Sequence, residues 1–200
     1  MNFPVPCLDI SLILGEYGPL AKVAANWPLV ESALDSARIY SPMCAVAAIA
    51  TISVETARFS PVKEGGDPVY LSSLYENRPD LGNIQPGDGA KFASRGFVRI
   101  VGRRDYEHFG REIGLDLVAN PDAPLSPAVA AAILAVYFKE RNVRTFADRQ
   151  NWEIVRRRVS GGLSGWPRFN DAATNLVAAL KHSPPAALQN SRGEIEEFDR

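Results

Sequence analysis

Cysteine, histidine and long apolar runs are all scarce in this chain, and each scarcity excludes a class of protein. The 200 residues include only two cysteines, Cys7 and Cys44, and two histidines. Two thiols so far apart in sequence do not make a disulfide framework, and a metal site needs more ligands than these residues supply. We therefore expect reduced thiols, no metal and no cofactor.

The chain also lacks any apolar run of the roughly 20 residues that a membrane span needs. Its first residues, MNFPVPCLDISLILGEYG, contain neither the basic start nor the long apolar core of a secretory signal. We expect synthesis in the cytoplasm, so that action on a cell wall would require release or export by another factor. The net charge of −1 gives no general attraction to nucleic acid, and we expect no such partner.

Helix signals dominate what the chain does contain. Apolar residues make up 46% and charged residues 22%, which is ordinary for one domain with a real core. Pro28 is predicted at the first turn of a helix, because apolar residues follow it at helical spacing. Ser41-Pro42 predicts a second helix start, and the segment after it, MCAVAAIATISVETARF, is apolar on nearly every face. This segment predicts a buried helix through the centre of the domain, with Glu55 near its end.

The rest of the chain divides into loops, helices and a tail. Residues 60–97 are rich in glycine, proline and asparagine, and predict loops around one short helix near Tyr70 to Tyr75. A loop region of this length is usually functional. Further helices are predicted over 103–114, 127–141, 150–160 and 166–181. We expect an all-α, monomeric protein with one domain over 1–182 and a flexible acidic tail over 183–200.

Two glutamates near the loop region suggest a chemistry. Breaking a glycosidic bond requires one carboxylic acid that protonates the leaving oxygen and a second carboxylate that activates water or attacks the sugar. Glu55, at a buried helix end, suits the acid because desolvation favours the protonated form of a carboxyl group. Glu64 follows nine residues later, on the loop side. Taken alone, a glutamate at a helix end is more often a solvated or salt-bridged surface residue.

Three longer motifs make the pair informative. VETARFSPVKE, YENRPDLGNIQPGDGAKFASRGFVRIVGRRDY and VRRRVSGGLSGW together resemble the glycoside hydrolase family 19 chitinases, and still more their relatives among phage endolysins. The resemblance runs from about Ala24 to Leu180. It implies a lysozyme-like helical fold whose long loop region lines a substrate cleft, and hydrolysis of β-1,4 linkages between amino sugars. It matches Glu55 to the general acid and Glu64 to the base of an inverting mechanism.

The same resemblance places other residues in or near the groove. It puts Tyr75, Glu76 and Arg78 in the groove wall. In the Gly-Asp-Gly turn, we expect Asp88 to hold backbone amides while both neighbouring glycines take a positive φ.

Several groove positions depart from the family pattern. Arg99 and Val101 stand where the family has glutamine and a hydroxyl residue, and Val101 cannot hold a water by hydrogen bonding. Asp105 and Ser160 each replace an asparagine. These substrate-binding positions indicate either a shifted substrate or a weakened or lost activity.

Several arginines suggest an acidic substrate, although they also have a simpler interpretation. Peptidoglycan carries lactyl and peptide carboxylates, which a basic rim would attract. Alternatively, the same arginines lie on solvated helix faces with local ion pairs. The arginines in question are Arg95, Arg99, Arg103, Arg104 and Arg156 to Arg158.

The sequence therefore favours an endolysin-like peptidoglycan hydrolase whose partner is the bacterial cell-wall glycan. A catalytically silent homologue that binds a glycan or a protein through the cleft is the alternative, and a chitinase is a weaker one.

Overall fold

The computed structural model describes residues 17–56 and 58–182, and helices make up most of them. The predicted all-α class is confirmed. The helices are α1 (Leu20–Ser36), α2 (Pro42–Glu55), α3 (Pro68–Tyr75), α4 (Asp88–Lys91), α5 (Arg103–Ile113), α6 (Pro127–Glu140), α7 (Val143–Ala147), α8 (Trp152–Ser160) and α9 (Trp166–His182), with 3₁₀ turns at Pro79–Leu81 and Ala123–Leu125. The strands β1 (Val62–Lys63) and β2 (Arg95–Gly96) pair in antiparallel register.

Helix α2 is the buried centre of the domain, as its sequence predicts. The Ser41 side chain accepts a hydrogen bond from the Cys44 backbone N–H at 3.0 Å, and Pro42 occupies the first turn. Every residue from Cys44 to Ile52 is buried, so the helix has no solvent face along most of its length. It packs against α9, α7 and α8. Its last residue is Glu55, which the core therefore positions.

Helix α1 begins earlier than predicted. Pro28 lies inside the helix rather than at its first turn. An interior proline removes one backbone hydrogen bond and costs about 3 kcal/mol or more. The buried residues Val23, Trp27, Val30 and Leu34 lie on both sides of Pro28, and α1 packs along α6. Burial of these side chains at about 1.5–3 kcal/mol each outweighs the cost of the proline.

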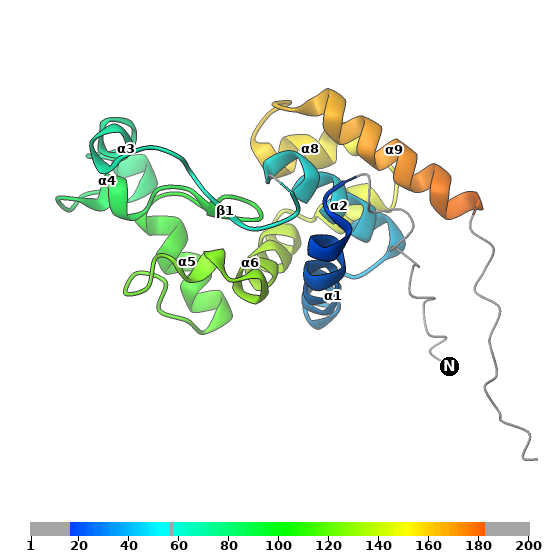
Figure 1. Ribbon diagram of the computed structural model, residues 1–200, viewed down its shortest axis with the longest axis horizontal. Helices are drawn as coiled ribbons and strands as arrows, with labels where there is room; N and C mark the ends of the chain where they lie inside the picture. The colour runs from blue at the N-terminus through cyan, green and yellow to red at the C-terminus, as the bar shows by residue number, and fades with distance from the viewer. Residues whose placement is uncertain (1–16, 57, 183–200) are drawn as a thin grey trace, which may run out of the picture.

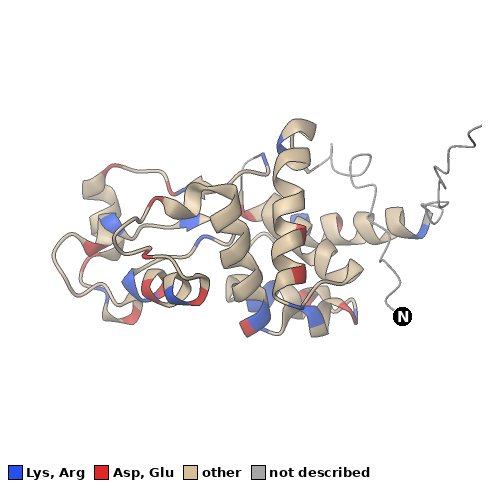
Figure 2. Cartoon of the chain, turned by 90° about the horizontal axis from the view of Figure 1, so that it is seen from below, with Lys and Arg blue, Asp and Glu red and all other residues tan. Residues whose placement is uncertain are grey.

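The molecule has two ends joined by a middle section (Figure 1). α3 and α4 lie at one end, whereas α1, α2, α8 and α9 lie at the other, with α5 and α6 between them. The short β1–β2 ribbon runs between the ends. Basic and acidic residues are interspersed over much of the described chain, whereas most of α2 and α6 has none (Figure 2).

The loop region contains more order than its composition predicts. The expected helix near Tyr70 is α3, but α4 and the two strands were not predicted. Gly87 has the expected positive φ of 88°. The prediction is wrong for Gly89, which lies in α4; there a Cβ would come within 2.6 Å of the Glu76 backbone nitrogen. Close approach, rather than a left-handed backbone, requires the second glycine.

The remaining predictions concern the cysteines, the C-terminal tail, membrane spans and metal sites. Cys7 and the tail over 183–200 lie outside the described residues, whereas Cys44 is a buried free thiol. Within the described part, no helix has both the length and the apolar character to cross a membrane. Over the same residues, no cluster of three or more histidine, cysteine or acidic side chains is placed to hold a metal.

Candidate active site

Glu55 ends α2 beside a buried arginine of α8. Arg156 Nη1 lies 2.7 Å from Glu55 Oε1, although its N–H bonds are not aligned for a hydrogen bond. The Arg156 side chain is 2% exposed and that of Glu55 is 18% exposed. Arg156 Nε donates to the Ser164 carbonyl at 2.7 Å, and the guanidinium lies 5.7 Å from the Phe169 ring centroid. A cation fixed by α8 and α9 therefore holds the carboxylate of α2 in place.

Glu64 follows β1 and is held by a different set of partners. Its backbone N–H donates to the Ser94 carbonyl at 2.9 Å, which continues the β1–β2 ladder. The Tyr75 hydroxyl lies 2.9 Å from each carboxylate oxygen, and the Ser94 N–H donates to Oε2 at 3.4 Å. Burial and the bond to Glu64 raise the pKa of Tyr75 to about 12. The phenol therefore stays protonated and serves as a donor to Glu64.

A cleft of about 460 Å³ is lined by Glu55 and by partners of Glu64, whereas Glu64 itself is not among its lining residues. Glu55 lines it directly. Tyr75, Ser94 and Arg99, which contact or pair with Glu64, line it as well. The full set of lining residues is Glu55, Tyr75, Ser94, Val98, Arg99, Val101, Tyr137, Arg156, Val159, Ser160, Gly161 and Ser164.

Three predicted substrate-binding residues are not part of this lining. Glu76 accepts hydrogen bonds from the Gly87 and Gly89 N–H groups, each at 2.7 Å. Arg78 makes a two-bond contact with the neighbouring Asp80. These side chains hold the loop region together rather than facing the cleft.

Asp105 is the third such residue. It accepts a hydrogen bond from the Val101 N–H at 3.3 Å, and its burial raises its pKa above the ordinary value. Asp105 thereby holds the backbone of Val101, which lines the cleft.

The other predicted positions do line the cleft. Val101 presents only methyl groups there. The Ser160 hydroxyl lies 2.9 Å from the Arg156 carbonyl and 2.8 Å from the Gly162 carbonyl, so the backbone at the end of α8 already engages it. Arg99 has a left-handed backbone, with φ at 55°.

The expectation of a basic rim is wrong for two of its arginines. Arg156 is buried against Glu55. Arg95 is 3% exposed, and bonds Asp122, the Tyr106 hydroxyl and backbone carbonyls. Sequence reasoning also missed Tyr137, which lines the cleft and donates to the Val159 carbonyl at 2.7 Å. Tyr137 lies in the apolar helix predicted over 127–141, and the spacing there does not distinguish it from a core residue.

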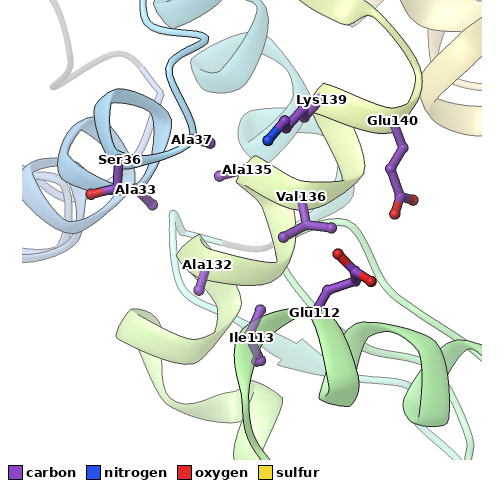
Figure 3. Close-up of a pocket in the computed structure, with 10 residues that line it drawn as sticks. All are labelled: Ala33, Ser36, Ala37, Glu112, Ile113, Ala132, Ala135, Val136, Lys139 and Glu140. Carbon is purple, nitrogen blue, oxygen red and sulfur yellow. The ribbon is translucent and has the colours of Figure 1, made fainter.

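A second and larger hollow lies between α1, α5 and α6 (Figure 3). This groove has a volume of about 630 Å³, and four of its ten lining residues are alanines. Glu112 and Glu140 stand at its edge, and a Glu140 carboxylate oxygen lies 2.7 Å from His108 Nε2. The lining residues are Ala33, Ser36, Ala37, Glu112, Ile113, Ala132, Ala135, Val136, Lys139 and Glu140.

Comparison with known proteins agrees with the motifs. A curated protein of Haemophilus influenzae, described as a glycosyl hydrolase family 19 domain-containing protein, is 30% identical to this chain over 97 residues. The match covers 48% of this chain and 46% of that protein, so the chain spans about half the length of the curated relative. A crystal structure of a chitinase C mutant aligns with a TM-score of 0.57 and 16% identity, over 84% of this chain and 85% of that one. No family model matches the chain.

Proposed function

Because this chain is related to the family 19 glycoside hydrolases, we propose that it is a glycosidase that cleaves β-1,4 bonds between amino sugars of the bacterial cell wall. The observation that carries the proposal is one cleft that is lined by Glu55 and by three residues that contact or pair with Glu64. Partners far away in sequence hold each carboxylate: Arg156 for Glu55, and Tyr75 with Ser94 for Glu64. Partly burying two carboxylates, each with its own partners, is costly, and groups held in this way are typical of functional sites.

In the proposed reaction, Glu55 protonates the glycosidic oxygen as the bond from that oxygen to the anomeric carbon breaks. Glu64 takes a proton from a water molecule, whose oxygen forms the new bond to the anomeric carbon from the opposite face. The products are two shorter glycans, with Glu55 left ionised and Glu64 left protonated. Proton exchange with solvent resets both groups.

The partners of the two glutamates fit these roles. Arg156 is 2.7 Å from Glu55 and stabilises the carboxylate that forms once the proton has left. The Tyr75 phenol has one proton, so it bonds one Glu64 oxygen at a time and leaves the other for water.

The endolysin-like motifs support the bacterial wall as the substrate, rather than chitin. We further propose that the protein is made in the cytoplasm and reaches the wall through another factor.

The second candidate, a silent homologue that binds a glycan or a protein, is favoured by Val101. This side chain lines the cleft at a position from which it offers no hydrogen bond to the attacking water.

The test is digestion of purified peptidoglycan and of chitin oligosaccharides, with mass spectrometry of the new reducing ends. We expect new amino-sugar reducing ends from peptidoglycan with the wild-type protein, and none above background with Glu55→Gln. Glu153→Gln, an exposed residue paired only with Arg157 on the outside of α8, is the matched control and should behave as wild type. Absence of cleavage of either glycan by the wild type would support the silent homologue.

A further inference from the structure

Arg99 is the exposed arginine of the cleft lining, and its terminal nitrogens make no hydrogen bond among the described residues. Its Nε donates to the Ser94 hydroxyl at 3.1 Å, and that hydroxyl donates to the Arg99 carbonyl at 3.3 Å. The Arg95 N–H donates to the Ile100 carbonyl at 3.1 Å and closes the turn around it. The Arg99 backbone and the Nε edge of its guanidinium group are therefore held, while the two terminal nitrogens remain available.

The nearest charge to that free end pairs with it only loosely. Arg99 Nη2 lies 4.0 Å from Glu64 Oε1, a much longer separation than the 2.7 Å of the Arg156–Glu55 pair. The Arg99 side chain is 37% exposed, whereas that of Arg156 is 2% exposed. Of the two arginines in the lining, one is committed to a protein carboxylate and the other presents donors to the cleft.

The chemistry of the guanidinium group indicates which class of ligand Arg99 would bind in the cleft. Its parallel N–H bonds match the two oxygens of a carboxylate, and a charge-assisted pair of this kind is about twice as strong as a neutral hydrogen bond. Glutamine, the residue that the family resemblance places at this position, suits neutral sugar hydroxyls and amides instead. Glu64 repels a second carboxylate, but at 4.0 Å it leaves the outer edge of the guanidinium open.

We propose that Arg99 binds a carboxylate carried by the substrate, so that the cleft selects acidic amino-sugar strands over neutral ones. The inference rests on the proposed function for its glycan, and adds the acidic group. Two sources share this chemistry: the lactyl carboxylate of a peptide-free muramic acid, and the carboxylates of an attached stem peptide.

Binding measured by calorimetry tests the proposal without requiring turnover. The ligands are three tetrasaccharides: chitotetraose, a peptide-free strand of alternating N-acetylglucosamine and N-acetylmuramic acid, and the same strand with its stem peptides. The proteins are the wild type, Arg99→Gln, and Arg157→Gln as a control that loses an equal charge from the exposed face of α8. Circular dichroism verifies that each variant is folded.

We expect the wild type and Arg157→Gln to bind at least one acidic strand about tenfold or more tightly than chitotetraose, a factor that corresponds to about 1.4 kcal/mol. Arg99→Gln should bring that ratio close to one. Preference for the peptide-free strand would identify the lactyl carboxylate, and preference for the other strand the stem peptide.

Equal binding of all three ligands by the wild type, binding of none, or a preference that survives in Arg99→Gln would overturn the proposal. An acidic preference without any cleavage would leave the inference standing and refute only the hydrolase.

Discussion

The cleft beside Glu55 and the groove between α1, α5 and α6 differ in what they contain more than in size. The groove is larger, at about 630 Å³ against about 460 Å³, but its lining combines alanine and other small or apolar residues with Glu112, Lys139 and Glu140, none of which is buried. The cleft contains a carboxylate bound to a buried arginine, and Tyr75 and Arg99 beside a second carboxylate. Volume alone would point to the groove. Charged groups held in place against their preference for water point to the cleft.

The largest difference between the two hollows should appear on removal of one carboxylate from each. Glu55→Gln should lower the rate of peptidoglycan cleavage by about a hundredfold or more, because general acid catalysis supplies about 10²–10⁴. Glu112→Gln, at the edge of the groove, should leave the rate unchanged. Release of reducing ends measures both. Equal loss in the two variants would remove the distinction between cleft and groove.

The second difference concerns stability. Arg156→Met should lower the free energy of unfolding by about 3 kcal/mol, because it leaves Glu55 beside an apolar wall and the Ser164 carbonyl without its donor. The figure is at the low end of the usual range because Glu55 retains some contact with solvent. Arg157→Met, one residue along on the exposed face, should change it by less than about 0.5 kcal/mol. Urea denaturation compares the two, and similar losses would contradict the assignment of a buried pair.

Tyr75→Phe sharpens the comparison inside the cleft. The change removes only the hydroxyl that bonds Glu64, so the fold should persist and cleavage should fall by about tenfold, which is about one hydrogen bond. Tyr70→Phe, an exposed residue of the same helix, is the control. Progress curves over a range of substrate concentrations should show the loss in kcat more than in KM. An unaltered kcat would show that Glu64 needs no support from Tyr75.

The remaining expected effect lies in the loop region that builds one wall of the cleft. The bidentate bond from Arg103 holds the pKa of Asp88 below its ordinary value of 3.8. Because the folded state lowers this pKa, its contribution to stability is complete above the unfolded value and is lost as the pH falls through the folded value. The free energy of unfolding should therefore decline below about pH 4.

Asp88→Asn tests this origin of the decline. It should lower stability at pH 7 by about 1–3 kcal/mol and flatten the acid decline. Asp80→Asn removes a partner of Arg78 in an exposed pair that solvent screens, and should have a much smaller effect on both. Chemical denaturation between pH 3 and 7 makes the measurement, and an unchanged acid profile in Asp88→Asn would place the effect elsewhere.

The sequence predicts the elements that depend on local pattern. α2 follows from its capping serine and α6 from the proline at its first turn, and both follow from continuous apolar composition. The position of Glu55 at the end of α2 follows as well. Elements that are stabilised by interactions between residues near in sequence can be predicted from a short stretch of chain.

The missed features depend on contacts between distant segments. Nothing in the run Arg156-Arg157-Arg158 says which of the three turns inward, because that is decided by packing against Phe169 and Glu55. A two-residue strand such as β1 is too short to show an alternating pattern. The pairing that brings Glu64 beside Ser94 therefore could not be predicted from the sequence. Local preference predicts a helix start at Pro28. In the structure, packing of α1 against α6 overrides that preference and the helix begins earlier.

The central claim is that Glu55 and Glu64 act as acid and base across one cleft, with a water molecule as the nucleophile. The most direct measurement is proton nuclear magnetic resonance of the new reducing end during the first minutes of digestion, before mutarotation. An inverting reaction at a β-1,4 linkage must release the α-anomer first. We expect the α-anomer from wild-type protein. Initial release of the β-anomer would require a covalent or substrate-assisted mechanism and would contradict the assignment of Glu64 as base.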